Sequence, residues 1–378
     1  LKESGGDGGM RYTIGQLAEI IDGDRGKNYP KQDEFYPQGY CLFLNTGNVT
    51  KEGLTFEENQ FITKEKDEAL RKGKLKRGDI VYTTRGTVGN AGYYNSNVPY
   101  ENVRINSGMV ILRANGEIVD ARFLYQILKS EYYRPYFKQY CTGSAQPQLP
   151  IKNFSQIYLN VPDIKTQHRI ADILSAYDDL IENNQKQIKL LEEAAQRLYK
   201  EWFVDLRFPG HENTKIVDGV PEGWNEKTLS QVANVIMGQS PKSEFYNSEK
   251  KGLPFHQGVG SYGVRFVMDD IYSTSYTRIA EPDSILFSVR APVGRLNITK
   301  NKVVIGRGLA AINQTDGCQS YLYYLLKNKF FKDNIVGNGS IFASVSKDEL
   351  LNQKFLIPER NLMMQFEKIV SQMDKQIE

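Results

Sequence analysis

The stretch "GDIVYTTRGTVG", Gly78 to Gly89, has a close copy later in the chain, "DSILFSVRAPVG" from Asp283 to Gly294. Each copy is an apolar run that enters a short polar segment, the pattern of a buried strand leading into a turn. One arginine stands in each turn, Arg85 in the first and Arg290 in the second, at an offset of 205 residues. The repetition of strand, turn and arginine predicts that the fold itself is duplicated.

Further matches in the same order support the duplication. A block at an offset of 196 pairs Gly143-Ser144 with Gly339-Ser340 and continues without a gap to Glu182 and Glu378. Two weaker matches pair "IGQLAEIIDG" (14–23) with "LSQVANVIMG" (229–238), and "SGMVIL" (107–112) with "RGLAAI" (307–312). Because all of them keep one order, we interpret the chain as two related units.

Composition narrows the class of protein. The chain has 378 residues, enough for more than one domain, and a net charge of +3, so a nucleic-acid surface would have to be local. The three cysteines, Cys41, Cys141 and Cys318, are far apart and form no CxxC pair, which argues against a disulfide framework or a zinc site. The opening "LKESGGDGG" has no apolar core and no run suits a membrane helix, so we expect a cytoplasmic protein.

Each unit combines short strands with helices. The predicted strands are apolar runs bounded by Gly, Pro, Asn and Asp, namely 41–45, 79–84 and 109–113 in the first unit and 284–289 and 302–306 in the second. Helical patterns cover 121–140 and 320–335. The fold class is therefore α+β.

A long helix follows the first globular part. Apolar residues recur at alternating steps of four and three, the seam of a coiled coil: Ile170, Leu174, Tyr177, Ile181, Asn184, Ile188, Leu191, Ala195, Leu198 and Trp202. Asp163 or Thr166 is expected to cap its start, and "FPG" (208–210) to end it. A helix of this length needs a partner for its apolar stripe.

The second unit supplies a shorter helix with the same spacing. Its seam is Phe366, Val370, Met373 and Ile377, and the pattern stops with Glu378. Paired antiparallel, this helix would meet only residues 188–202 of the first and leave the seam from Ile170 to Asn184 bare. We expect either that the second helix is truncated or that another polypeptide covers the bare half.

These features together resemble the specificity (S) subunits of type I restriction-modification systems. The stretches that carry the resemblance are "TGSAQPQLP" (142–150), "LNVPDIKTQHRIADILSAYDDLIE" (159–182), "VPEGW" (220–224) and "FLIPERNLMMQFEKIVSQMDKQIE" (355–378). Two departures are the short second helix and "GNGSIFASVS" (337–346), which places Phe342 where the first unit has Gln146. Any role of Gln146 is therefore not transferred to Phe342.

The resemblance implies two tandem α+β target-recognition domains, each followed by a long α-helix, with the helices paired as an antiparallel coiled coil. The expected boundaries are a flexible lead (1–9), the first target-recognition domain (10–162), the first spacer helix (163–208), a linker (209–220), the second target-recognition domain (221–358) and the second spacer helix (359–378). Such a chain is not itself catalytic. It reads a bipartite, gapped DNA target and positions modification (M) subunits, two of them expected, and through them restriction (R) subunits.

The resemblance also implies that this chain binds no cofactor, while its partners use S-adenosylmethionine, ATP and Mg²⁺. Candidate DNA contacts are polar or cationic residues in turn-rich stretches: Arg85, Thr84, Arg104, Lys27 and Tyr29 in the first unit, and Arg290, Arg265, Tyr262, Arg295 and Arg307 in the second. The strip "RKGKLKR" (71–77), with Lys74 and Lys76, is either a phosphate contact or a solvated run of charge.

Two other classes of function stay open as alternatives. A methyltransferase or nuclease acting alone would need a catalytic motif, but "NVPY" (97–100) lacks a preceding cofactor loop and "PDSILFSVR" (282–290) lacks the later acid and lysine of a nuclease. We predict no catalytic residue and no metal site. A coiled-coil scaffold that does not bind DNA would share the helices but would not need two arginine turns.

Overall fold

The computed structural model describes residues 9–143, 146–330 and 344–378. They form two compact units, Leu1–Glu182 (unit 1) and Asn183–Glu378 (unit 2). Ser144, Gly339, Ser340 and Phe342 of the predicted repeat, and residues 1–8 of the predicted lead, lie outside the described residues.

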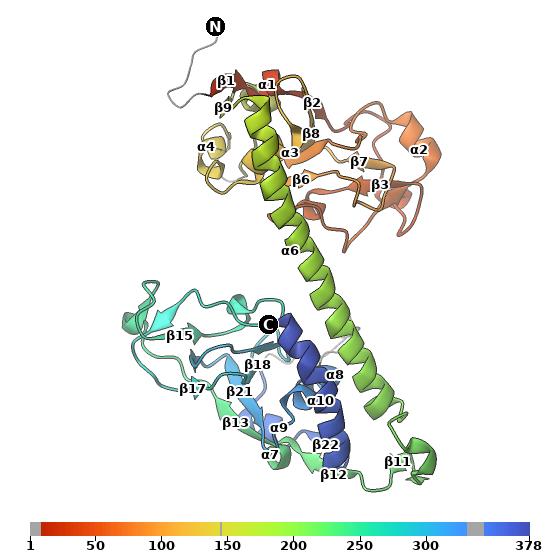
Figure 1. Ribbon diagram of the computed structural model, residues 1–378, viewed down its shortest axis with the longest axis vertical. Coiled ribbons are helices and arrows are strands. Elements are labelled where there is room, and N and C mark those ends of the chain that lie inside the picture. Colours follow the sequence, from red (N-terminus) through yellow and green to blue (C-terminus); the bar gives the residue numbers. More distant parts are fainter. Residues whose placement is uncertain (1–8, 144–145, 331–343) are drawn as a thin grey trace. The chain divides into compact units, whose positions relative to one another are not determined.

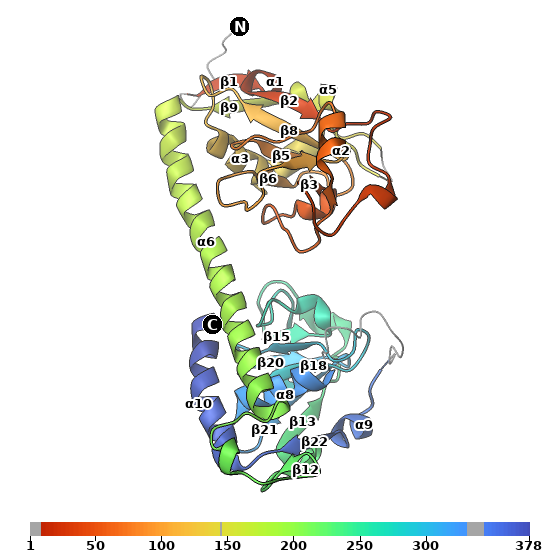
Figure 2. The ribbon, with the colours of Figure 1, turned by 90° about the vertical axis from the view of Figure 1, so that its right-hand side faces the viewer.

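The central sheet of unit 1 is antiparallel, with strands in the order β2-β8-β5-β6 (β2, β8 and β6 are labelled in Figure 1 and β5 in Figure 2). The strands are β2 Ala18–Asp22, β8 Met109–Ala114, β5 Ile80–Thr83 and β6 Ala91–Tyr93. Successive β5 residues face opposite sides: Tyr82 packs with helix α3 (Ala121–Lys129), and Val81 packs with the neighbouring three-stranded sheet. Because both faces are covered, β5 is buried along its whole length.

The three-stranded sheet of unit 1 has the order β4-β3-β7, formed by β4 Phe61–Ile62, β3 Cys41–Leu44 and β7 Val103–Ile105. β3 and β7 run parallel, with Leu44 opposite Ile105. Asn106 N–H donates to Leu44 O, so the loops that follow β3 and β7 lie together. Thr84 N–H donates to Gly108 O, which joins the turn after β5 to the loop that follows β7.

Unit 2 repeats this plan and confirms the predicted duplication. Its central sheet has the order β13-β21-β18-β19, with β13 Ala233–Met237, β21 Leu309–Gln314, β18 Ile285–Ser288 and β19 Leu296–Ile298 (Figure 2). β15 (Leu253–His256) runs parallel to β20 (Val303–Ile305), as β3 does to β7. Helix α8 (Gln319–Phe330) packs on the central sheet in the core of unit 2.

The predicted long helix is α6, Ile164–Tyr199, which continues as a π-helical turn over Lys200–Val204. Asp163 caps it: its Oδ1 accepts from Thr166 N–H at 3.0 Å and its Oδ2 from the Thr166 hydroxyl at 2.7 Å. α6 contributes to both cores, since Ala171 is buried in unit 1 and Ala195 in unit 2.

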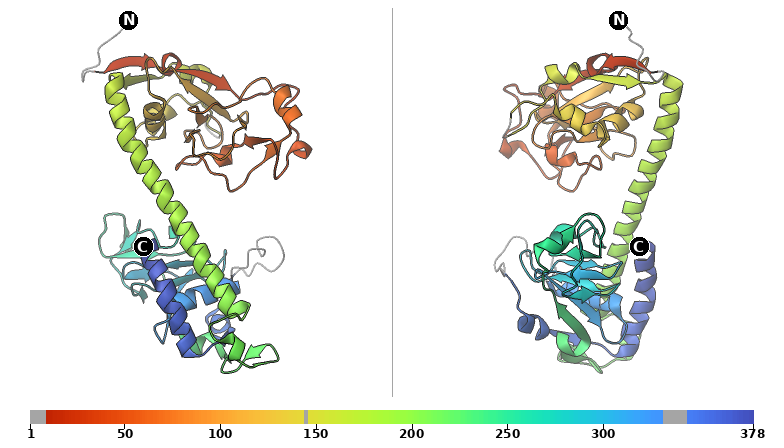
Figure 3. Two further views of the ribbon diagram at one scale, coloured as in Figure 1. Left: turned by 45° about the vertical axis from the view of Figure 1, so that its right-hand side comes forward. Right: turned by 90° about the vertical axis from the view of Figure 1, so that its left-hand side faces the viewer.

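The predicted second helix is α10, Arg360–Ile377. Within unit 2 it runs antiparallel to the last turns of α6 (Figure 3). The Phe366 ring, which is fully buried, lies 5.9 Å from the ring of Tyr199 and 6.1 Å from that of Trp202, centroid to centroid. This confirms the predicted antiparallel pairing with the C-terminal part of α6.

The helix predicted over 121–140 is wrong as a single helix. α3 ends at Lys129 and a separate helix, α4, covers Arg134–Lys138. Pro135 explains the break, because a proline lacks an N–H and is tolerated only in the first turn of a helix.

The remaining elements frame these sheets. The helices are α1 Ile14–Leu17, α2 Lys64–Ala69, α5 Ile151–Ser155, α7 Leu229–Val232 and α9 Lys347–Leu351, with 3₁₀ turns at Gln32–Glu34, Thr46–Asn48, His211–Asn213, Ser243–Phe245 and Val259–Ser261. The strands are β1 Met10–Thr13 with β9 Tyr158–Val161, β10 Ile216–Val217 with β11 Val220–Pro221, β12 Asn225–Thr228 with β22 Lys354–Ile357, and β14 Tyr246–Asn247, β16 Tyr272–Ser273 and β17 Ile279–Ala280. Within the described ranges, none of the helices has both the length and the apolar content to cross a bilayer.

Candidate nucleic-acid interface

The Arg85 turn is held in place by the backbone while its arginine stays exposed. Thr84 N–H and Arg85 N–H both donate to Gly108 O, at 2.9 and 3.1 Å, and Leu149 N–H donates to Thr84 O at 2.9 Å. Gly86 has φ +70° and Gly89 φ +99°, a left-handed backbone that favours glycine. The Arg85 side chain therefore projects from a rigid turn at the end of a buried strand.

The Arg290 turn in unit 2 is built in the same way. Val289 N–H donates to Gly308 O at 2.9 Å, and Val345 N–H donates to Val289 O at 2.8 Å. Ser288, which ends the strand, donates its hydroxyl to Pro292 O at 2.6 Å and closes the turn. Arg290 is exposed, as Arg85 is. The two turns thus share a strand, a neighbouring loop and an exposed arginine.

A hollow of about 150 Å³ lies beside the Arg290 turn. It is lined by Gln257, Gly258, Val259, Ser288, Arg290, Ala291, Arg307 and Gly308. The structure thus brings together two of the predicted arginines, from different loops. A guanidinium only donates hydrogen bonds, so two of them at one hollow suit a partner rich in acceptors, such as a phosphate or the O6/N7 edge of guanine.

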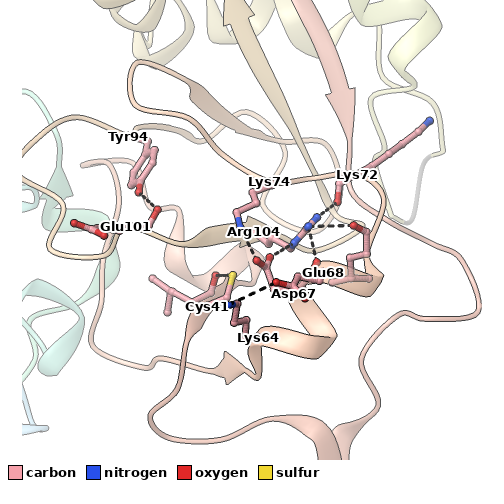
Figure 4. Close-up of polar contacts among 11 residues, drawn as sticks. Cys41, Lys64, Asp67, Glu68, Lys72, Lys74, Tyr94, Glu101 and Arg104 are labelled. Carbon is pink, nitrogen blue, oxygen red and sulfur yellow. Dashed lines mark hydrogen bonds and ion pairs between the residues drawn. The ribbon is translucent and has the colours of Figure 1, made fainter.

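The prediction that Arg104 contacts DNA is wrong, because its side chain is only 6% exposed. Its guanidinium donates to Asp67 Oδ1 at 2.5 Å and to the carbonyls of Asp67, Leu70 and Lys72 at 2.7–3.1 Å (Figure 4). Burial alone would raise the pKa of Asp67, but hydrogen bonds from Lys74 and Arg104 outweigh it and lower that pKa. Arg104 therefore fixes α2 to β7 and does not reach the surface.

Arg265 is corrected for the same reason, and Tyr262, which is half-buried, has its hydroxyl turned inward. Arg265 is 2% exposed and forms ion pairs with Asp374 and Glu192 at 2.5 and 3.6 Å. The Tyr262 hydroxyl donates to Leu286 O at 3.0 Å, and burial raises the pKa of this phenol. The Arg265 side chain and the Tyr262 hydroxyl are therefore engaged within unit 2.

Thr84 is also removed as a direct contact, since it is 4% exposed and its hydroxyl donates to Gly108 O at 3.1 Å. The remaining candidates are at least partly accessible. Tyr29 is half-buried with its ring edge against Phe43, Lys27 and Arg307 are exposed, and Arg295 is half-buried.

The basic strip 71–77 is attached to Asp67 by an ion pair from Lys74. Lys74 keeps 41% of its side chain exposed while its Nζ lies 2.5 Å from Asp67 Oδ2. Lys76 is exposed, and the Arg77 guanidinium lies over the Tyr94 ring at 4.2 Å. The cations of the strip are thus carried on a fixed backbone at the surface of unit 1.

Comparison with known proteins decides the family. Residues 8–193 and 221–378 match the family described as the type I restriction modification DNA specificity domain. The chain belongs to this family. Specificity subunits recognise the DNA target and are non-catalytic, which confirms the prediction that this chain is not itself an enzyme.

Relatives of this specificity subunit share most of its length. The protein named type I restriction enzyme MjaX specificity subunit, from Methanocaldococcus jannaschii, is 30% identical, covering 92% of this chain and 83% of its own. The HindI specificity subunit of Haemophilus influenzae is 25% identical, covering 92% and 91%. The solved S subunit from M. genitalium has a TM-score of 0.62 at 17% identity, covering 100% of this chain and 92% of that one, and shows the same fold.

The helix seam of the specificity subunit divides into an exposed and a packed part. Leu174, Tyr177 and Ile181 are 39%, 63% and 54% exposed. The other predicted seam positions range from exposed to buried. Asn184 is exposed, and the half-buried positions are Ile170, Ile188, Leu191, Leu198 and Met373. The buried positions are Phe366, Val370 and Ile377. Leu174, Tyr177 and Ile181 therefore leave apolar side chains in water on one face of α6.

Two residues of the candidate interface were missed by the sequence prediction. Gln257 lines the hollow at Arg290, and Arg25 donates to Ser107 O beside the Arg85 turn. Arg25 lies two residues after the repeated segment 14–23, but the equivalent residue of unit 2 is Ser240, so the repeat gives no signal for it.

Proposed function

We propose that this specificity subunit reads a bipartite, gapped DNA duplex, with one half-site contacted by each unit. The observation that carries the proposal is the equivalent placement of Arg85 and Arg290. Both stand exposed on a turn after a buried strand, and each turn is bonded to the equivalent neighbouring loop. An arginine in this position can donate two parallel hydrogen bonds to a guanine edge or grip a phosphate.

The other accessible candidates extend this surface. Lys27 and Tyr29 in unit 1, and Arg295 and Arg307 in unit 2, are assigned to the DNA side of each unit. Lys74 and Lys76 on the basic strip are assigned to phosphates, because a lysine ammonium is a point charge without the fork geometry of a guanidinium and suits the neutralisation of backbone charge.

The spacing of the half-sites is assigned to α6. Two readers on one face of a duplex must lie about 34 Å apart, or a multiple of it. The 36 residues of α6 give a continuous helix of about 54 Å at 1.5 Å per residue. An uninterrupted helix with residues in both cores is suited to act as a ruler.

The partners follow from the same assignment. We place the subunit in the cytoplasm, where it binds two modification subunits and, through them, restriction subunits. These partners use S-adenosylmethionine, ATP and Mg²⁺, whereas this chain binds no cofactor. The exposed apolar residues of α6 support a protein partner there, because they would otherwise remain in water.

The test is a selection from randomised DNA duplexes by the full chain purified with its modification subunits. Two short enriched blocks separated by a fixed unspecified gap are expected. One continuous block would contradict a two-unit reader. No enrichment at all would favour the coiled-coil scaffold that does not bind DNA.

A further inference from the structure

The two units place an arginine and a serine at the same pair of contacting positions, but in opposite order. In unit 1 the positions hold Arg25 and Ser107, and Arg25 Nη2 donates to Ser107 O at 3.2 Å. In unit 2 they hold Ser240 and Arg307, and Arg307 N–H donates to Ser240 Oγ at 3.2 Å. Each unit thus has one arginine at this contact, contributed from the opposite side.

The equivalence of these positions follows from strand register. Asp22 pairs with Val110 in unit 1, and Met237 pairs with Ala310 in unit 2. Arg25 lies three residues after Asp22, as Ser240 lies three residues after Met237. Ser107 lies three residues before Val110, as Arg307 lies three residues before Ala310.

Close packing of the backbone fixes this contact in both units. A Cβ on Gly23 would lie 2.2 Å from Asn106 O, and a Cβ on Gly238 would lie 2.1 Å from Gly306 O. No side chain fits at either glycine, so the two loops are pressed together just before the arginine–serine pair. The second arginine therefore starts from a defined place on a rigid loop in each unit.

This second arginine lies beside the first. The residue after Ser107 is Gly108, whose carbonyl holds the Arg85 turn, and the residue after Arg307 is Gly308, whose carbonyl holds the turn before Arg290. In unit 2 both arginines line the same hollow. In unit 1, Arg25 is 45% exposed, and its ion pair with Asp22, at 3.2 Å, is a surface pair, a kind of ion pair that holds a side chain only weakly.

We infer that Arg25 and Arg307 are equivalent DNA-contacting residues, so that each unit presents two guanidiniums, Arg25 with Arg85 and Arg290 with Arg307, to one acceptor-rich group of its half-site. That group is the O6/N7 edge of a guanine or a phosphate, since both accept paired hydrogen bonds from guanidinium. The inference rests on the proposed function and adds the second arginine to it.

The test moves the arginine across the contact in the full chain purified with its modification subunits. Arg25→Ser is expected to weaken binding of the selected duplex by about 5- to 150-fold, the range of one good arginine contact. The double variant Arg25→Ser/Ser107→Arg copies the arrangement of unit 2 and is expected to recover binding to within about threefold of the natural chain. Arg197→Ser removes the same charge from an exposed site on α6 and is expected to change nothing.

The selected motif separates the two acceptors. A guanine contact predicts that Arg25→Ser loses preference at one position of the first half-site and leaves the second unchanged. A phosphate contact predicts a uniform loss of affinity and a salt dependence reduced by about 0.9 in the log–log slope. Either result supports the inference.

Binding by Arg25→Ser equal to that of the natural chain, or a double variant as weak as the single one with unchanged thermal unfolding, would overturn it. The mirror pair in unit 2, Arg307→Ser and Ser240→Arg/Arg307→Ser, decides the matter where a unit 1 variant unfolds. A natural chain that selects no bipartite motif contradicts the proposed function instead, so the two failures are distinguishable.

Discussion

Arg265 Nη2 lies 2.5 Å from Asp374 Oδ1 in the interior of unit 2, where the arginine side chain is 2% exposed. Its Nη1 lies 3.6 Å from Glu192 Oε1, and its guanidinium carbon lies 3.9 Å from the centre of the Tyr323 ring. Glu192 belongs to α6 and Asp374 to α10. One buried arginine therefore ties both helices to the globular part of unit 2.

Replacing Arg265 by methionine is expected to lower the free energy of unfolding of unit 2 by about 3–5 kcal/mol, because two carboxylates lose their partner in a poorly solvated site. Tryptophan fluorescence in a urea titration measures this, since the two tryptophans of the chain, Trp202 and Trp224, both lie in the unit 2 core. Arg290→Met changes an exposed arginine and is the control, with an expected change within about 0.5 kcal/mol. Equal changes in the free energy of unfolding for the two substitutions would show that the buried ion pairs of Arg265 do not stabilise unit 2.

Acid should destabilise unit 1 through Asp67. Hydrogen bonds from Lys74 and Arg104 outweigh burial and hold its folded pKa below the ordinary value, which is about 3.9 in an unfolded chain. The stability from this shift is fully present above the unfolded pKa and is lost as pH falls through the folded pKa. Asp67→Asn is expected to lower stability at neutral pH and to flatten the loss below about pH 4. Circular dichroism melts from pH 5 downward test this, with the exposed Asp33→Asn as control. If the stability of the Asp67→Asn variant falls with pH as steeply as that of the natural chain, the assignment to Asp67 is contradicted.

The duplication and the long helix could be predicted from sequence because apolar periodicity is a local signal. β5, β18 and α6 all lie where their patterns indicate. The roles of single arginines could not be predicted, because they depend on distant partners: Arg104 bonds Asp67, 37 residues away, and Arg265 bonds Asp374, 109 residues away. In a linear sequence these buried arginines resemble the exposed ones.

The Arg25–Ser107 contact was hidden for a related reason. Aligning the two units position by position sets Arg25 against Ser240 and Ser107 against Arg307, so neither match scores as similar. Only the spatial contact between the two loops shows that each unit keeps one arginine there.

Arg290→Ala is expected to relax one position of the second half-site by about 1–3 kcal/mol, while the first half-site stays unchanged. The reason is that Arg290 is exposed at a hollow of unit 2, whereas Arg265 is buried. Sequencing of duplexes selected by the variant complex measures this. Arg85→Ala is the matched variant and is expected to relax only the first half-site. Loss of both half-sites from either single change would contradict independent reading by the two units.

Lengthening α6 should widen the gap between the half-sites. Four helix-forming residues inserted between Asn184 and Gln185 add about 6 Å and slightly more than one turn, so the seam keeps nearly the same face. This site is chosen because Asn184 and Gln185 are exposed, whereas Glu192 and Ala195 a few turns later hold Arg265 and the unit 2 core. The selected gap is expected to grow by one or two base pairs, at about 3.4 Å per step. The same four residues inserted between Asp218 and Gly219, in the turn of the β10–β11 hairpin, leave the helix length unchanged and serve as the control. A gap that stays constant in the helix variant while DNA binding persists would show that α6 is not the ruler.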